Sequence, residues 1–313
     1  MSEYGDVQAG QQSDELTDLS GRVAVVTGAA AGLGRAEAIG LARAGAVVVV
    51  NDIEPALTGS DVIDEIGNAG SSAVAVPGDI SQRGTADALV AAAQARGGLD
   101  IVVNNAGITR DKMLFNMTDE DWDAVINVHL RGHFLLTRNA ATYWRSRAKD
   151  AGGQVYGRLI NTSSEAGLVG PPGQANYGAA KAGITALTLS AARSLDRYGV
   201  TANAICPRAR TAMTADVFGD APELGDGEID PLSPEHVVTL VRFLASPAAE
   251  AVNGQVFIVY GPTVTLLAAP TVGHRFTADT SAWGPADLSA TMQKYFAGRD
   301  RDVTFAATGV MES

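Results

Sequence analysis

The chain has 313 residues, of which 46% are hydrophobic and 19% are charged, and its formal net charge is −12. That length and apolar content fit one large or two small globular domains with a substantial core. The acidic charge argues against nucleic acid and anionic membranes as partners, and no apolar run approaches the roughly 18 residues that cross a bilayer. A polar N-terminus unlike a secretory signal and a single cysteine, Cys206, favour a cytoplasmic protein.

Strand-like and helix-like segments alternate along the chain. Short apolar, β-branched runs predict seven strands, at residues 22–27, 46–52, 72–77, 100–104, 158–162, 200–205 and 255–260. Helices are predicted at about 33–44, 56–69, 81–96, 119–147, 175–197 and from 234 onward, with Ser81, Thr118 paired to Asp121, and Ser233 as caps. This βαβα order predicts a single α/β domain built on a doubly wound, parallel, seven-stranded sheet with helices on both faces.

A glycine-rich turn directly follows the first predicted strand. It reads TGAAAGLG, Thr27–Gly34, and leads straight into a helix. Gly28, Gly32 and Gly34 allow a tight turn and a close approach of the backbone to a pyrophosphate, which the helix N-terminus also favours. Because the turn lies between a strand and a helix of an alternating α/β chain, it predicts a dinucleotide site, and hence a Rossmann-type fold, rather than a turn without a ligand.

An acidic residue closes the second predicted strand. Asp52 lies eighteen residues beyond Gly34, where a carboxylate reaches the adenosine ribose hydroxyls and repels the additional phosphate of NADP. Ala29, Ala30 and Ala31 carry no charge that could offset this repulsion. The sequence therefore favours NAD as the cofactor, and the alternative interpretation of Asp52 is a solvated residue at a strand end.

Taken together, these features resemble the short-chain dehydrogenase/reductase family over about residues 20–262. TGAAAGLG matches the family's TGxxxGxG, NNAG at Asn104–Gly107 matches its fourth-strand motif, and Tyr177-x-x-x-Lys181 matches its YxxxK, with Ser164 thirteen residues upstream. Within that family, VVVNDI, NNAGITRDKML and LSPEHVVTLVRFL resemble the (3R)-hydroxyacyl-CoA and 17β-hydroxysteroid dehydrogenase domain of the peroxisomal multifunctional enzyme and its bacterial sterol-degradation relatives.

The resemblance implies four catalytic residues, Asn127, Ser164, Tyr177 and Lys181. Tyr177 and Lys181 lie one turn apart on a helix face, so we expect the ammonium to lower the pKa of the phenol. The phenol then exchanges a proton with a secondary alcohol while Ser164 hydrogen-bonds the substrate oxygen. By resemblance, Lys181 also holds the nicotinamide ribose and Asn127 anchors a water in the proton relay. Each residue alone also has an ordinary structural interpretation.

The resemblance further implies a set of cofactor contacts. They are Gly28, Gly32, Leu33, Gly34, Asp52, Asp79, Ile80, Asn105, Ala106, Gly107, Tyr177, Lys181, Pro207 and Thr211. In CPRART, Arg208 stands where glycine is usual in the family, and Thr211 comes one residue early. Cys206 is interpreted as a small buried hydrophobe. No metal is expected, because no partner pattern surrounds the histidines, which are His129, His133, His236 and His274.

Domain boundaries are placed around these motifs. We expect a disordered lead-in at residues 1–20, the dinucleotide-binding catalytic domain at 21–262, and a C-terminal extension at 263–313 that contains a helix within 281–296. By resemblance, the acidic residues 212–232 form a lid over the substrate. Cations at the rim either bind CoA phosphates or are solvated surface charges; they are Arg110, Lys112, Arg208 and Arg210.

The predicted function is NAD-dependent oxidation of a secondary alcohol to a ketone. The expected substrate is a 3-hydroxyacyl-CoA with a steroid side chain or a fatty acyl group, or a 17β-hydroxysteroid. Two alternatives remain open. One is a 3-oxoacyl carrier-protein reductase, which Asp52 disfavours, and the other is a catalytically silent dinucleotide-sensing protein, which the intact catalytic residues disfavour. The resemblance also implies a homotetramer, or a homodimer, formed through the helices at about 119–147 and 175–197.

Overall fold

The computed structural model describes residues 16–214, 218–219, 221–225, 227–300 and 303–307. Within these residues one sheet has the strand order β3-β2-β1-β4-β5-β6-β7-β8. Every neighbouring pair is parallel except β7 and β8. The strands are β1 Val23–Thr27, β2 Val47–Asn51, β3 Ala73–Ala75, β4 Ile101–Asn104, β5 Gly157–Thr162, β6 Val200–Pro207, β7 Val256–Tyr260 and β8 Thr263–Leu266.

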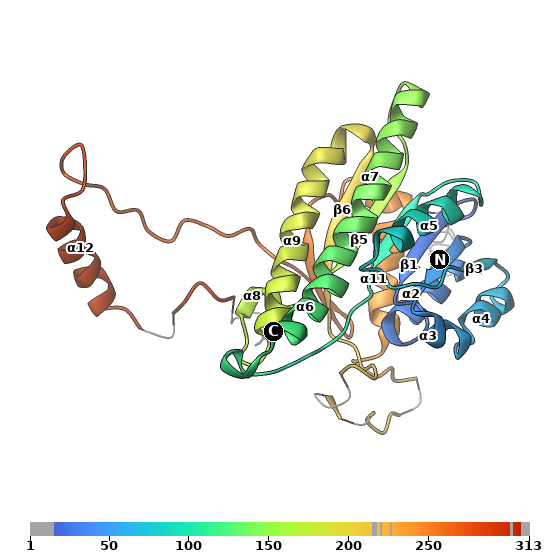
Figure 1. Cartoon of the computed structure of the whole chain (residues 1–313), viewed down its shortest axis with the longest axis horizontal. Helices are drawn as coiled ribbons and strands as arrows, with labels where there is room; N and C mark the ends of the chain where they lie inside the picture. The colour runs from blue at the N-terminus through green and yellow to red at the C-terminus, as the bar shows by residue number, and fades with distance from the viewer. Residues whose placement is uncertain (1–15, 215–217, 220, 226, 301–302, 308–313) are drawn as a thin grey trace, which may run out of the picture. The chain divides into compact units, whose positions relative to one another are not determined.

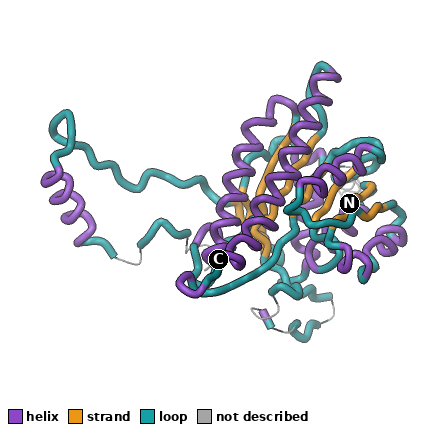
Figure 2. The backbone as a smooth tube through the Cα atoms, viewed as in Figure 1, coloured by secondary structure: helices purple, strands orange, loops and turns teal. Residues whose placement is uncertain are grey.

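Helices cover both faces of this sheet (Figures 1 and 2). The helices before residue 267 are α2 Gly32–Arg43, α3 Glu54–Thr58, α4 Val62–Asn68, α5 Arg83–Gln94, α6 Asp119–Ile126, α7 Gly132–Ala151, α8 Ala166–Val169, α9 Ala175–Leu195 and α11 Pro234–Ala245. A π-helical turn, Asn127–Arg131, joins α6 to α7, and 3-10 turns lie at Leu114–Asn116, Asp196–Tyr198 and Pro247–Ala249. The predicted Rossmann-type, doubly wound sheet is confirmed.

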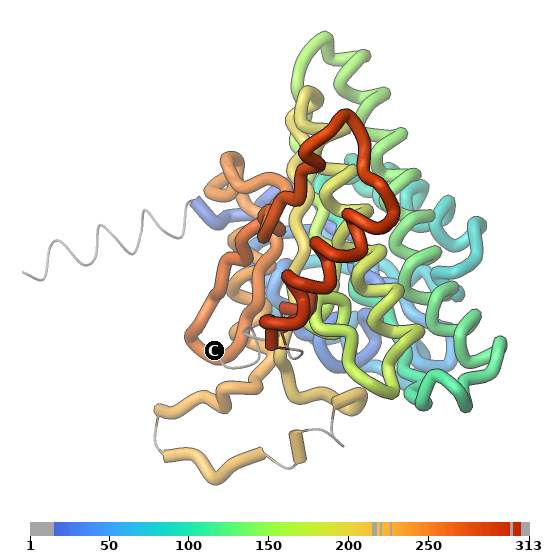
Figure 3. The backbone as a smooth tube through the Cα atoms, turned by 90° about the vertical axis from the view of Figure 1, so that its left-hand side faces the viewer, coloured from blue at the N-terminus to red at the C-terminus, as the bar shows by residue number. Residues whose placement is uncertain are grey.

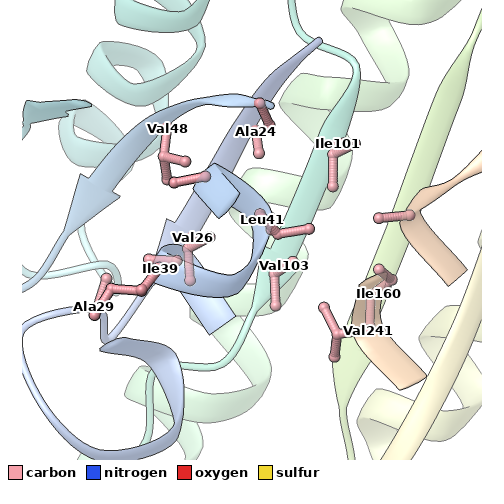
Figure 4. Packing of buried hydrophobic residues seen from close by; sticks show 14 of the residues in the cluster. Ala24, Val26, Ala29, Ile39, Leu41, Val48, Ile101, Val103, Ile160 and Val241 are labelled. Carbon is pink, nitrogen blue, oxygen red and sulfur yellow. The ribbon is translucent and has the colours of Figure 1, made fainter. Parts of the chain in front are cut away.

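The core consists of two apolar layers separated by the sheet. Successive side chains of a strand point to opposite faces, so Ala24 and Val26 of β1 enter the layer beneath α2, α4 and α11 (Figure 4). Val23 and Val25 enter the layer beneath α5, α7 and α9. Because β1 is buried on both faces, its sequence VAVVT is continuously apolar up to its last residue instead of alternating.

The sheet has one strand that we did not predict. β8 returns antiparallel beside β7 after a two-residue turn, with Tyr260 paired to Thr263. We had placed residues from 263 onward in the C-terminal extension, so this strand was missed. β8 is an edge strand and three of its four residues are exposed, so burial imposes no strong apolar pattern on it.

Helix boundaries depart from the prediction in two places. The predicted helix at 56–69 is two helices, since α3 ends at Thr58 with Gly59 as its C-cap and α4 begins at Val62. The predicted cap Ser81 does not cap α5, because its hydroxyl donates to the Asp79 carboxylate at 2.8 Å. The capping box of Thr118 and Asp121 is confirmed, as is the Ser233 cap of α11.

Residues 1–15 of the predicted lead-in lie outside the described residues. The remainder contradicts the expected disorder, because Leu19 is fully buried and its N–H donates to the Ala44 carbonyl oxygen at 2.7 Å. Packed structure therefore begins before residue 21.

The chain divides into two compact units, Met1–Leu266 and Leu267–Ser313. The second unit contains α12, Pro285–Ala297, drawn in red in Figure 3. The sequence predicted a helix within residues 281–296, and α12 confirms it to within one residue at its end. Rings of His274, Phe276 and Tyr295 cluster beside it, with centroids 4.4–4.9 Å apart. Within the described part of the chain, no helix is both long and apolar enough to cross a membrane.

Candidate active site

A cavity of about 380 Å³ lies where the central parallel strands β1, β2, β4, β5 and β6 end. Ligands of open α/β sheets bind at this carboxyl edge, where the strand order reverses direction. The order here reverses between β1 and β4. Every residue predicted to contact the cofactor lines the cavity except Gly34, and the predicted catalytic residues Ser164, Tyr177 and Lys181 line it as well.

The glycine-rich turn forms one wall. Gly28 and Gly32 have φ values of +68° and +56°, in the left-handed region that favours glycine. Gly34 does not line the cavity, because its place is inside the turn, where a Cβ atom would collide with the Gly28 carbonyl oxygen. A hydrogen bond connects this turn to the end of β4, since the Asn105 Nδ2 donates to the Thr27 carbonyl oxygen at 3.1 Å.

Asp52 lies at the end of β2 and has both carboxylate oxygens engaged by backbone. The Ala30 N–H donates to Oδ2 at 3.1 Å and the Ile53 N–H donates to Oδ1 at 2.8 Å. These bonds hold the carboxylate at the cavity wall that it lines. Asp79 lines the same wall, and its carboxylate accepts from the Ser81 N–H at 2.8 Å.

The wall fits the phosphate and ribose groups of a dinucleotide. Two left-handed glycines let backbone approach a ligand closely, and α2 starts beside them without an acidic residue in its first turn. Within the described residues its N-cap, Ala31, offers no side-chain hydrogen bond to the first N–H groups of the helix. A helix N-terminus in this condition favours an anion.

Ser164, Tyr177 and Lys181 meet at the cavity although two elements supply them. Ser164 follows β5, while Tyr177 and Lys181 lie in the first two turns of α9. The Ser164 Oγ accepts a hydrogen bond from the Ala166 N–H at 3.1 Å, and the Ser164 side chain lies close enough to the Tyr177 phenol to affect its pKa. Lys181 is 2% exposed, its Nζ donates to the Thr162 carbonyl oxygen at 2.6 Å, and Nζ lies 5.4 Å from the centroid of the Tyr177 ring.

The pKa values of this group differ from our expectation. Burial lowers the pKa of Lys181 to about 7, so its amine is only partly charged at neutral pH. Removal from solvent also raises the pKa of Tyr177, and the nearby Ser164 side chain opposes that rise. We expected Lys181 to lower the pKa of the phenol. Lys181 is not among the groups that shift this pKa, and its Nζ is directed to the Thr162 carbonyl oxygen.

The structure does not bring Asn127 to the site, contrary to our expectation. Asn127 is exposed and does not line the cavity. Two residues of the π-helical turn line it, Val128 and His129, and the His129 ring lies edge-to-face with Tyr177 at a centroid distance of 5.2 Å. We had read His129 as structural or surface. The asparagine in VINVHL matched the family's residue type, and helical spacing alone does not reveal a π-helical turn.

The predicted rim cations are mostly engaged within the protein. Three of them form ion pairs at 2.7–3.0 Å: Arg208 with Glu165, Arg210 with Asp230, and Lys112 with Asp121. Arg110 is exposed. The pair of Arg208 and Glu165 joins the loop after β6 to the loop that carries Ser164, which accounts for an arginine where glycine was expected.

The loop after β6 also carries the predicted contacts Pro207 and Thr211, and both line the cavity. The Thr211 N–H donates to the Thr214 Oγ1 at 2.9 Å. Met213, from the predicted lid, lines the cavity as well and is 47% exposed. Residues 215–217, 220 and 226 of that lid lie outside the described residues. No group of three His, Cys, Asp or Glu side chains in the described ranges is arranged to hold a metal ion.

A phosphate-binding turn between the first strand and helix of a doubly wound sheet is the mark of Rossmann-class α/β proteins, and this chain is one of them. The family model described as short chain dehydrogenase matches residues 22–221, and the chain belongs to that family. Members of the family use NAD or NADP, so a dinucleotide is the ligand that this site is built to hold.

Curated relatives agree with the resemblance seen in the sequence. Hydroxyacyl-CoA dehydrogenase ChsB1 of Mycobacterium tuberculosis is 74% identical over 305 residues, which are 96% of each chain. A 3-oxoacyl-[acyl-carrier-protein] reductase of Synechocystis is 40% identical over 256 residues, 80% of this chain and 99% of its own. Peroxisomal multifunctional enzyme type 2 of Mus musculus is 40% identical over 248 residues, 76% of this chain and 31% of its own.

A solved structure supports the fold. The crystal structure of a short chain dehydrogenase from Mycobacterium avium superposes with a TM-score of 0.80 at 42% identity, and the match covers 92% of this chain and 99% of that one. The predicted family and its relation to the peroxisomal multifunctional enzyme are confirmed.

Proposed function

We propose that this protein oxidises the hydroxyl group of a 3-hydroxyacyl-CoA thioester to a ketone with NAD. The observation that carries the proposal is the meeting of Ser164, Tyr177 and Lys181 in the cavity that the glycine turn and Asp52 also line. The substrate class is supported by the 74% identity to a hydroxyacyl-CoA dehydrogenase. We infer a bulky apolar acyl group, a steroid side chain or a fatty chain, because the lid adds small and apolar residues such as Met213 to the cavity wall.

NAD is the cofactor that the charges favour. Asp52 presents a carboxylate fixed by the Ala30 and Ile53 N–H groups, which would repel the additional phosphate of NADP. Among the described residues that line the cavity there is no arginine, and Lys181 is the only lysine. A phosphate on the adenosine ribose would therefore meet a negative charge without a compensating cation.

The catalytic residues divide the proton chemistry between them. A bound nicotinamide would accept the hydride from the carbon that bears the hydroxyl. Tyr177 would remove the hydroxyl proton and return it in the reverse direction. Ser164 would hold the substrate oxygen beside the phenol, since both side chains line the same cavity. Since burial raises the pKa of Tyr177, alkaline pH should favour oxidation over reduction.

The test offers the purified protein a steroid-side-chain 3-hydroxyacyl-CoA and NAD and measures the NADH formed. A free 17β-hydroxysteroid and NADP serve as comparators. We expect turnover to be fastest with the thioester and NAD. Tyr177→Phe should lower kcat about a thousandfold with little change in NAD affinity, because it removes the transferable proton and keeps the ring.

Other outcomes would contradict the proposal in different ways. Turnover of the free steroid alone would make the protein a hydroxysteroid dehydrogenase. Faster reduction of a 3-oxoacyl carrier protein with NADPH would make it a biosynthetic reductase. NAD binding without turnover of any of these compounds would indicate a dinucleotide-sensing protein.

We infer a homotetramer, or a homodimer, assembled through α6–α7 and α9. Large apolar side chains remain exposed on α6 and α7 of the single chain, since Trp122 is 39% and Phe134 is 42% exposed. Light scattering of the protein leaving a sizing column would give the subunit number, and a monomer at micromolar concentration would contradict the inference. A cytoplasmic location is part of the same proposal and can be tested by cell fractionation.

A further inference from the structure

We propose that His129 is a positioning residue for Tyr177, in the place that the sequence pattern gave to Asn127. This inference rests on the proposed function, because it concerns the same reaction. In this role the neutral His129 ring is hydrogen-bonded to the backbone of the cavity wall. Its contact with Tyr177 sets the orientation of the phenol that exchanges the proton.

The π-helical turn is what brings His129 inward. Its defining bond runs from the Gly132 N–H to the Asn127 carbonyl oxygen, five residues back. His129 is 1% exposed, whereas Asn127, two residues earlier, is exposed. Such turns inside helices are rare and occur most often at functional sites.

Backbone holds the ring on one side. The His129 Nε2 lies 2.8 Å from the Ile108 carbonyl oxygen and 3.0 Å from the Ile108 nitrogen, so either tautomer makes a hydrogen bond to this residue. Gly107 provides the space for the ring, because a Cβ atom there would collide with the imidazole. Gly107 and Ile108 both line the cavity, so His129 joins the cavity wall to the helix.

Tyr177 lies against the same imidazole. The two ring planes meet at 88° with centroids 5.2 Å apart, which is a favourable edge-to-face arrangement. Because Ile108 fixes the imidazole, this ring contact restrains the tilt of the Tyr177 ring.

The imidazole is neutral throughout the working pH range. Burial lowers the pKa of His129 to about 3, and the nearby Lys181 lowers it further. The titratable groups around it are Lys181 and Tyr177 on α9 and His133 on α7, and His133 is also buried and neutral. A neutral imidazole adds no positive charge beside Lys181. The Nδ1 atom of His129 is buried without a hydrogen-bond partner among the described residues, so the imidazole keeps one polar atom at the cavity wall that bears no hydrogen bond.

Two substitutions separate the positioning role from mere support of the fold. His129→Phe keeps an aromatic ring against Tyr177 but loses the bond to Ile108. His129→Asn keeps a polar group that can reach backbone but loses the ring contact. Asn127→Ala is the comparison variant from the same π-helical turn.

The measurements are kcat, KM and the pH dependence of NADH formation with the 3-hydroxyacyl-CoA, NAD affinity by calorimetry, and Tm. We expect His129→Phe to lower kcat roughly tenfold to a hundredfold, because small misplacements of a reacting group have effects of this order. NAD affinity should stay within about threefold. The pH midpoint of oxidation should rise by about half a unit or more, because a phenyl ring replaces the polar imidazole that contacts the Tyr177 ring. In His129→Asn the pH midpoint should lie between those of the parent protein and of His129→Phe.

A purely structural role would lower Tm and leave the pH midpoint unchanged, and that result overturns the proposal. A loss of kcat in Asn127→Ala at least as large as in His129→Phe overturns it as well. If the parent protein binds NAD but does not turn over the thioester, the proposed function has failed. In that case the positioning role is tested by absorbance titration of the Tyr177 phenol. The titration of each protein is compared with that of the same protein carrying Tyr177→Phe, and the difference gives the pKa of Tyr177. A Tyr177 pKa that His129→Phe leaves unchanged overturns the positioning role.

Discussion

At the scale of single residues, the most unusual feature is a carboxyl group in the core. Glu37 of α2 is fully buried, and neither of its carboxylate oxygens has a hydrogen-bond partner among the described residues. Burial raises the pKa of Glu37 to about 8, so the group is mostly protonated at neutral pH. Glutamate inside an amphipathic helix ordinarily faces solvent, and no sequence pattern distinguished this one.

The raised pKa makes Glu37 a source of pH-dependent stability. Its folded pKa of about 8 exceeds the ordinary value of 4.5, so ionisation favours the unfolded chain increasingly as pH rises from 4.5 to about 8. Glu37→Met should therefore raise the free energy of unfolding by on the order of 2 kcal/mol at pH 8 and by much less at pH 5. Urea denaturation at both pH values checks this, and equal gains at both would contradict it.

The proposed preference for NAD also rests on a single residue, Asp52. Asp52→Ser removes the carboxylate that would accept hydrogen bonds from the adenosine ribose and repel a ribose phosphate. We expect kcat/KM with NAD to fall roughly tenfold to a hundredfold, as for a lost charged hydrogen bond. The value with NADP should rise at the same time. Initial rates with both cofactors give the ratio, and a fall that is equal for both would show that Asp52 only supports the turn.

At the scale of elements, the pattern of the sequence located almost every strand and helix but not their details. Buried parallel strands such as VAVVT are continuously apolar, so all seven strands were found. The break between α3 and α4, the edge strand β8 and the π-helical turn were missed. Each of these features depends on one or two backbone hydrogen bonds or on a partner strand. Such interactions leave no periodic pattern of apolar residues in the sequence.

Helices α2 and α11 approach each other closely at Gly40, and a substitution there tests how tightly they pack. A Cβ atom at Gly40 would overlap the Val238 Cγ1, although alanine is the better helix former by about 1 kcal/mol. Gly40→Ala should lower the free energy of unfolding by a net of about 1–2 kcal/mol, because overpacking outweighs the gain in propensity. Val238→Ala in the same chain should recover part of the loss. A stabilised Gly40→Ala protein would show that the two helices separate at no cost.

At the scale of the whole molecule, the sheet ends at Leu266 and the second compact unit begins at Leu267. Removal of residues 267–313 should leave Tm within a few degrees and NAD binding within about threefold, because none of the described residues in that segment belongs to the sheet or lines the cavity. Scanning calorimetry and NAD titration of the shortened chain test this. Aggregation or loss of the cooperative transition would show that the extension covers an apolar surface of the folded domain.

The sequence by itself determined the α/β class and the parallel, doubly wound type of the sheet, and its motifs indicated Ser164, Tyr177 and Lys181. Those features follow from local periodicity and from short motifs whose residues are neighbours along the chain. The strand order came from the structure. The tertiary structure alone decided that His129 rather than Asn127 faces the cavity and that Glu37 is buried. It also paired Arg208 with Glu165. These outcomes depend on which side of a helix turn meets another element, and that is set by packing between segments far apart in the chain.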